Sequence, residues 1–395
     1  MPSSPISASR RSAIVLLLAW LVTLAPARVL AQDSGELTVV AAGLIGPRGF
    51  IVGDDAALFV ALAGIGGDQP GTAAPISDSP ISGGPSASVV RVEEGCSTVL
   101  ADRLPSAVGA TGRTVGASDV SVLDGQLYVL VAGGGAAHGQ SDAPNGIYVV
   151  TPEGDTELVA DLSAWFRRNP VARPTPLDAD PEGLPFSMAP IDGELWVVDA
   201  AAEQILRVTT DGTIARLVDF SAAPIGPMAI VPAPDGGAYV AAMGTAPYGP
   251  RTGKIVIVTP TGTVTDVWTG LTAPVGVAVD DAGTLYALET STSNSPVSPF
   301  LAPRAGRLIR QAGLDGRDVL ARRLNLPTAL AAGPDGTFYV AVSADDETGA
   351  ILRIAPGVGE ELVAPSGELV GPRCEDSGES GLRNVRRVLS LGEAS

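Results

Sequence analysis

The chain has 395 residues, of which 45% are hydrophobic and only 17% are charged, and its formal net charge is −18. A chain this acidic repels nucleic acid and anionic lipid surfaces, which argues against both classes of partner. The 48 glycines and 33 prolines are spread along the sequence rather than pooled in one block, so they indicate many short elements joined by turns.

Residues 1–31 are typical of a signal peptide. Arg10 and Arg11 precede the apolar run Ala13–Leu24, which is too short to span a bilayer comfortably, and small residues lead up to Ala31. We expect cleavage after Ala31, export to the periplasm or the extracellular space, and no membrane insertion of the mature chain. An uncleaved anchor is the alternative. The arginine pair leaves general secretion and twin-arginine export both open.

Six times along the chain, an apolar strand runs into a tight Asp/Gly turn and then into a second strand that usually carries an aromatic residue. The six copies are Gly49–Leu62, Asp119–Val131, Ser187–Asp199, Met228–Ala242, Gly276–Glu289 and Ala329–Val342. A second pair of strands follows each copy, most clearly within Leu195–Phe220. Four antiparallel strands repeated six times predict an all-β fold, a six-bladed β-propeller over residues 32–364, followed by a C-terminal tail over 365–395.

The sixth copy lacks a convincing fourth strand. The segment Glu36–Leu44 resembles the strands that end other copies, so we expect Leu37–Ala42 to supply the outer strand of blade 6 and to close the ring. The alternative is that Glu361–Ala364 completes blade 6. Closure by the two chain ends would suppress opening of the ring at this seam.

Cys96 and Cys374 are the only two cysteines. An even pair in an exported protein usually forms a disulfide, and a Cys96–Cys374 bridge would pin the C-terminal tail across the seam. Two free thiols are the alternative.

Several phrases resemble the ScyD/ScyE family of exported propeller proteins, which is related to NHL-repeat propellers. The phrases are GPRGFIVG, GASDVSVLDGQLYVL, NGIYVV, GELWVVDAAAEQILRV, APVGVAVDDAGTLYALE and LPTALAAGPDGTFYVAV. The resemblance covers roughly residues 37–356 and implies an exported propeller. The resemblance implies no catalytic residue in this chain.

The connections of a four-stranded blade alternate between the two faces of the ring. Turns after the first and third strands lie on one face and are short here, whereas every long insertion falls among the remaining connections. The long insertions are Gly64–Ser88, Gly133–Asn145, Gly244–Gly253, Thr290–Gly306, Pro105–Ala117 and Ser163–Pro185. We call the face that they build the long-loop face. Long loops on a rigid frame commonly carry binding sites, although neutral drift of surface loops is the alternative.

The same alternation places four charged residues near the mouth of the central channel on the long-loop face. Arg48 and Asp119 lie near the starts of innermost strands, and Asp199 and Glu289 end second strands. The three carboxylates could converge on a cation or a polar ligand. Alternatively, each accepts hydrogen bonds from neighbouring backbone N–H groups, and we favour this second interpretation.

Two further features concern the long loops. Asp178, Asp180 and Glu182 suggest a loop calcium site, because calcium prefers oxygen ligands. His138 is the only histidine and lies in the glycine-rich segment GGGAAHGQSD. We expect a solvated loop histidine there rather than a general base.

The sequence therefore favours a non-enzymatic, monomeric binding protein without a cofactor. Its partner would be a small molecule, a glycan or a protein held by the long-loop face. The alternative is a calcium-dependent propeller enzyme of the lactonase or hydrolase type with a carboxylate-lined channel mouth. Asn is absent from the expected channel positions and the chain has no G-x-S-x-G motif, and both observations weigh against the enzyme.

Overall fold

The computed structural model describes residues 35–372 except 73–80, 110–111, 175–179, 298–299, 314–315, 334–335, 343–347 and 358. The predicted signal peptide, Asp178 and Cys374 lie outside these residues. Within them, no helix has the length and apolar character that a membrane crossing requires.

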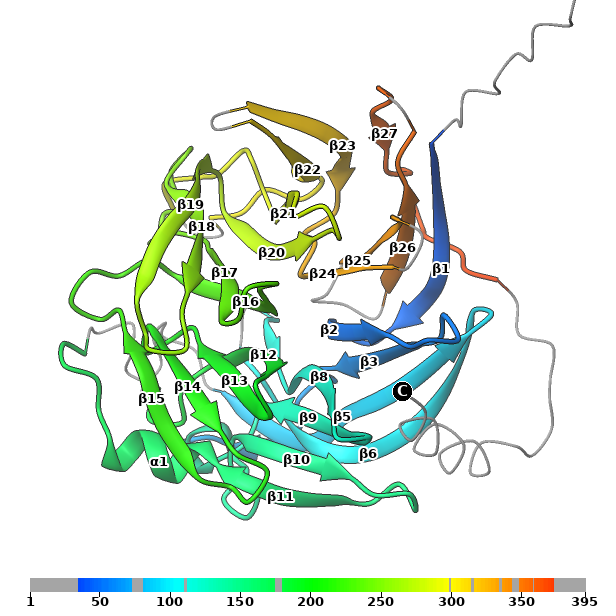
Figure 1. Ribbon diagram of the computed structural model, residues 1–395. Helices are drawn as coiled ribbons and strands as arrows, with labels where there is room; N and C mark the ends of the chain where they lie inside the picture. The colour runs from blue at the N-terminus through cyan, green and yellow to red at the C-terminus, as the bar shows by residue number, and fades with distance from the viewer. Residues whose placement is uncertain are drawn as a thin grey trace, which may run out of the picture. The chain divides into compact units, whose positions relative to one another are not determined.

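Six antiparallel sheets, each built on four strands, follow one another around a ring (Figure 1). From the innermost strand outward, blades 1 to 3 comprise β2 (Pro47–Val52), β3 (Leu58–Leu62), β5 (Ser82–Glu93) and β6 (Cys96–Val108); β8 (Ala117–Leu123), β9 (Gln126–Val131), β10 (Gly146–Val150) and β11 (Thr156–Asp161); and β12 (Pro185–Ile191), β13 (Glu194–Asp199), β14 (Gln204–Val208) and β15 (Ile214–Asp219).

The second half of the ring repeats this order. Blades 4 to 6 comprise β16 (Pro227–Pro232), β17 (Ala238–Ala242), β18 (Gly253–Val258) and β19 (Val264–Leu271); β20 (Pro274–Val279), β21 (Leu285–Glu289), β22 (Gly306–Ala312) and β23 (Gly316–Leu324); and β24 (Ala329–Ala332), β25 (Phe338–Val342), β26 (Gly349–Ala355) and β1 (Glu36–Leu44). Each innermost strand contacts the next, and β24 contacts β2, so the ring is closed. The predicted six-bladed propeller is confirmed.

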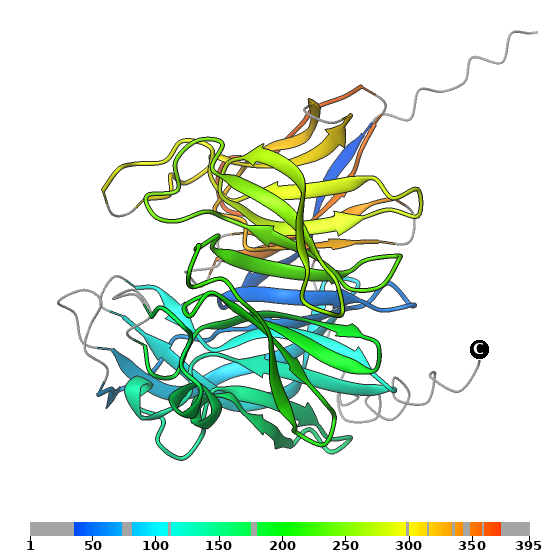
Figure 2. The same cartoon turned by 60° about the vertical axis from the view of Figure 1, so that its left-hand side comes forward.

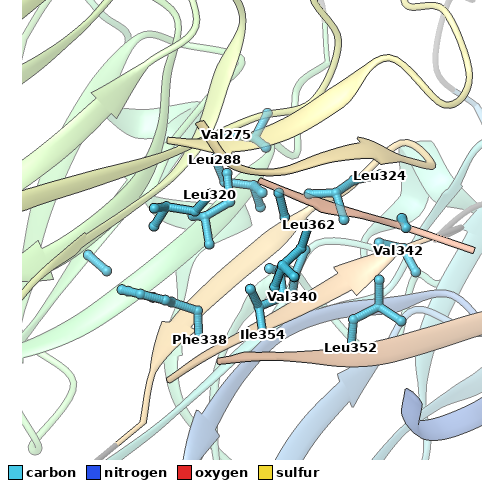
Figure 3. Packing of buried hydrophobic residues seen from close by; sticks show 14 of the residues in the cluster. Val275, Leu288, Leu320, Leu324, Phe338, Val340, Val342, Leu352, Ile354 and Leu362 are labelled. Carbon is cyan, nitrogen blue, oxygen red and sulfur yellow. The ribbon is translucent and has the colours of Figure 1, made fainter. Parts of the chain in front are cut away.

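The core consists of apolar clusters between neighbouring blades. Along β9, Val129 faces blade 1, whereas Tyr128 and Leu130 face blade 3, because successive side chains of a strand point to opposite faces. Figure 3 shows the cluster between blades 5 and 6, to which Leu320 of blade 5 and Val340 and Ile354 of blade 6 belong. Burial on both faces explains why the strands read as nearly continuous apolar runs, and each fully buried side chain of this size contributes about 1.5–3 kcal/mol.

The N-terminal strand closes blade 6, as predicted. β1 pairs with β26 in an antiparallel register that sets Leu37 opposite Ile354. The alternative closure was wrong, because β27 (Leu362–Val363) pairs in parallel with β23 and so extends blade 5. Leu362 and Val363 therefore lie beside the blade that precedes the one they would complete in that alternative.

The two faces of the ring differ as the alternation of connections predicts. Short hairpin turns such as Asp124–Gly125, with φ of 51° and 71°, suit the twist of antiparallel strands. The opposite face carries β4 (Gln69–Pro70), β7 (Thr114–Val115), the short 3₁₀ helix η1 (Ala136–His138) and α1 (Leu162–Arg168). Figure 2 shows α1 and several long connections together at the left of the ring.

Candidate functional site

A cavity of about 400 Å³ lies on the ring axis and is lined by the innermost strands of all six blades. Its polar side chains gather mainly where these strands begin, which is the end on the long-loop face. They are Arg48, Ser118, Asp119, Ser187 and Thr328, with Ser121 further along β8. The other side chains of the lining are almost all apolar, such as Ile51, Val231, Val279 and Leu330.

Asp119 links three innermost strands at this mouth. Its Oδ1 accepts from the Val120 N–H at 2.9 Å, and its Oδ2 accepts from the Met188 N–H of the next blade at 2.9 Å. On the other side, a Cβ added to Gly49 would lie 2.0 Å from Oδ1. Burial raises the pKa of Asp119 to about 7, although the hydrogen bonds act to lower it. The carboxyl group is therefore part of the channel wall and is bonded to the backbone.

Arg48 lines the same mouth and reaches toward blade 2. Its Nη2 donates to the Thr114 carbonyl at 2.8 Å and to Thr114 Oγ1 at 3.3 Å. The guanidinium group thus holds β7, which belongs to the link between blades 1 and 2, close to the channel. The structure brings Arg48 and Asp119 to one cavity, as the alternation predicts, and their role in binding a ligand stays a prediction.

Asp199 does not line the cavity. The side chain is completely buried, and its Oδ1 accepts from the Leu184 N–H at 2.9 Å while its Oδ2 accepts from Gln204 Nε2 at 2.8 Å. Burial raises the pKa of Asp199, and hydrogen bonds from Gln204 and nearby N–H groups oppose this shift. The carboxylate fastens the link into blade 3 to the end of β13.

Glu289 occupies the position at the end of β21 that Asp199 occupies at the end of β13. It is completely buried, accepts from the Thr272 N–H at 2.7 Å through Oε1, and forms an ion pair with Arg307. Arg317 lies 3.8 Å from Oε1. Neither Glu289 nor Asp199 is among the cavity-lining residues, so the carboxylates do not converge there with Asp119.

A second group of polar residues fixes the long loops of blades 2 and 3. His138 is only 2% exposed, so the expectation of a solvated histidine was wrong. Its Nδ1 lies 2.8 Å from the Gly134 carbonyl oxygen and its Nε2 lies 2.8 Å from Asp180 Oδ2. Burial alone lowers the pKa of His138, but the hydrogen bond and the charge of Asp180 outweigh it and raise this pKa. Both ring nitrogens face acceptors, which favours the imidazolium form.

Glu182 and Asn145 complete this group. Glu182 is 2% exposed, accepts from the Ala137 N–H at 3.2 Å, and pairs with Arg167 of α1 at 2.9 Å. Asn145 accepts from the Gly134 N–H at 2.7 Å and donates to the Glu182 carbonyl at 2.9 Å. The loop after β9, the helix α1 and the segment before β12 are thereby joined through buried hydrogen bonds.

The predicted calcium site overlaps this group. Oxygens of Asp180 and Glu182 face protein donors, and no cluster of three or more His, Cys, Asp or Glu suited to a metal occurs within the described ranges. Asp178 lies outside those ranges, so the site formed by Asp178, Asp180 and Glu182 stays a prediction. The sequence offered no sign that His138 would contact a residue 42 positions away.

No protein-family model and no curated protein sequence matches the chain. Among solved structures, it resembles a protein of unknown function from Bacteroides thetaiotaomicron, with 12% identity, a TM-score of 0.52 and coverage of 82% of this chain and 76% of the other. It also resembles a putative oxidoreductase (glucose dehydrogenase) from Thermus thermophilus, with 15% identity, a TM-score of 0.51 and coverage of 81% and 100%. At these identities the likeness shows the propeller fold alone.

Proposed function

We propose that this protein is a non-enzymatic binding propeller that holds its ligand on the long-loop face, at and around the mouth of the channel. The observation that carries the proposal is the buried network of His138, Asp180, Glu182 and Asn145. This network joins two separate connections, the loop between β9 and β10 and the link between β11 and β12, on the face where the polar end of the cavity opens.

The long loop of blade 1 joins the same structure. The Thr72 N–H donates to the Ala136 carbonyl of η1 at 3.2 Å. Ser106 Oγ donates to the Ala63 carbonyl at 2.6 Å and accepts from the Gly66 N–H at 2.9 Å. Loops that are ordered before a ligand arrives lower the entropic cost of binding. Drift alone would not require buried polar bonds between separate insertions, such as those that Asn145 and Glu182 make.

The alternative hydrolase function needs several carboxylates at the channel mouth. Of Asp119, Asp199 and Glu289, only Asp119 lines the cavity, and both of its oxygens accept backbone N–H groups. This placement supports binding over a carboxylate-centred reaction. We also propose that the protein is an exported monomer and that it belongs to the ScyD/ScyE family, on the strength of the phrases quoted above.

The function can be tested by a thermal-shift screen of glycans, peptides and small apolar molecules, followed by hydrogen-exchange measurements on each complex. We expect protection from exchange at Gly133–Asn145 and Thr290–Gly306. The short turns Asp124–Gly125 and Asp192–Gly193 on the other face are the internal control and should not change. Protection confined to those turns would contradict the proposal, as would turnover of a lactone and ester panel by the purified protein.

A further inference from the structure

We propose that the ligand of the channel is a neutral, mainly apolar small molecule whose body enters the cavity from the long-loop face. This inference rests on the proposed function and specifies the chemistry of the same site. It follows from the volume of the cavity, the character of its wall and the hydrogen bonds already made by its charged groups.

The wall beyond the mouth offers apolar contacts from opposite sides of the ring. Ile51 of blade 1, Val231 of blade 4 and Leu330 of blade 6 are all partly exposed and all line the cavity. Small-molecule sites in proteins are mostly apolar, with a few polar groups that fix orientation, and span roughly 300–1,000 Å³. The cavity, at about 400 Å³, falls within this range.

The charged side chains of the cavity already form hydrogen bonds within the protein, so they do not require a charged ligand. Arg48 and Asp119 are the charged side chains among the lining residues. Arg48 donates to Thr114, and Asp119 accepts from Val120 and Met188. A charged ligand would enter an apolar channel without a dedicated counter-charge, and the loss of its hydration would oppose binding. A neutral ligand avoids this cost.

The polar mouth suits one hydrogen-bonding group on the ligand. Ser187 and Thr328 lie on different blades at the cavity wall. Thr328 Oγ1 donates to the Pro47 carbonyl at 3.3 Å, and the Ser187 hydroxyl bonds to Asp119. A hydroxyl oxygen that donates its proton can still accept a hydrogen bond, so the two can orient a hydroxyl or amine group at the outer end of an apolar molecule. The ligand class is therefore a neutral amphiphile with its polar end toward the long loops.

The neutral aromatic fluorophore N-phenylnaphthylamine tests this inference. We expect saturable binding at one site per chain, with fluorescence enhanced by the apolar wall. Val231→Trp fills the channel and should weaken binding at least about tenfold. Val264→Trp is the matched control in the same blade, because Val264 is 37% exposed on the outer strand β19, and it should leave affinity unchanged.

Ala331→Phe, on the channel side of blade 6, provides a second blocking variant in case Val231→Trp does not fold. Circular dichroism and the melting temperature establish folding for each variant. The inference is overturned if the fluorophore does not bind, if both folded blocking variants bind it as wild type does, or if anilinonaphthalene sulfonate, its anionic counterpart, binds more tightly in the channel. Suppose that a ligand from the hydrogen-exchange screen protects the long loops and yet binds the blocking variants as tightly as it binds the wild type. That result would refute this inference and leave the proposed function standing.

Discussion

Gly49 and Asp119 touch across the boundary between blades 1 and 2, so closely that a Cβ on Gly49 would lie 2.0 Å from the Asp119 carboxylate oxygen and 2.9 Å from the Asp119 Cα. Asp119 is held on its other side by the backbone of β12. The carboxyl group therefore has no room to move aside, and the absence of a side chain at Gly49 is a packing requirement of the channel wall.

Gly49→Ala should consequently destabilise the ring by about 1–3 kcal/mol, the usual range for overpacking. Urea unfolding measures this free energy. Gly109→Ala is the matched control, because its new Cβ would meet no atom of the described residues within 4 Å and Gly109 is outside the left-handed region. Equal stability of the two variants would show that the Gly49–Asp119 contact is not tight.

Asp119 should make the protein less stable as the pH rises from about 4 to about 7. Its folded-state pKa is raised from 3.8 to about 7, so between these values the folded state binds more protons than the unfolded state. The free energy of unfolding then falls with pH, by at most about 1.4 kcal/mol per pH unit from this group. Asp119→Asn should flatten the slope between pH 4 and 7 whatever it does to absolute stability. An unchanged slope would contradict the assignment.

The sequence alone predicted the blades and their closure for a simple physical reason. A strand–turn–strand unit cannot bury both of its faces unless copies stack. The strand before the first copy was left over, and the last copy, at the other end of the chain, lacked a fourth strand. The parallel addition of β27 to blade 5 was not predictable, because a two-residue strand carries no pattern that selects one exposed edge over another.

The site was only partly predictable. Strand alternation gives the height of Asp199 along the ring axis but not its distance from that axis. Its burial depends on the Leu184 backbone folding over the carboxylate. Likewise, the partners of His138 come from a non-repeating insertion, where no periodicity predicts which loop residues meet.

His138 should titrate above its usual pKa of 6.5, because Asp180 stabilises the imidazolium. Its stabilisation of the fold is present below 6.5 and is lost as the pH rises through the folded-state pKa. Since the chain has one histidine, a ring NMR titration is unambiguous, and both ring nitrogens should be protonated at pH 6.5. Asp180→Asn should lower the pKa. A value at or below 6.5 in the wild-type protein would refute the proposed protonation state.

A disulfide between Cys96 and Cys374 remains a prediction, because Cys374 lies outside the described residues. The last described residues nevertheless run toward Cys96. A Cβ on Gly95 would meet the Pro372 ring at 2.6 Å, and Gly371 approaches the backbone of Ala42 in β1. The chain end thus passes from blade 6 to the turn between β5 and β6, two residues before Cys374, and a bridge there would fasten the seam that β1 closes.

We therefore expect no thiol labelling of the intact protein, two labelled cysteines after reduction under denaturing conditions, and a lower melting temperature in reductant. The loss should correspond to about 2–4 kcal/mol, which is typical of a disulfide that closes a long loop. Cys374→Ser should reproduce the effect of reductant on the melting temperature, and reductant should then change this variant no further.

Deletion of residues 359–395 should lower stability further than Cys374→Ser, because it also removes the β27–β23 pairing and the ion pair between Arg322 and Glu361. Labelling of both cysteines in the folded protein without reductant would rule out the bridge. Equal stability of the deletion and Cys374→Ser would show that the β27–β23 pairing and the Arg322–Glu361 ion pair do not stabilise the fold.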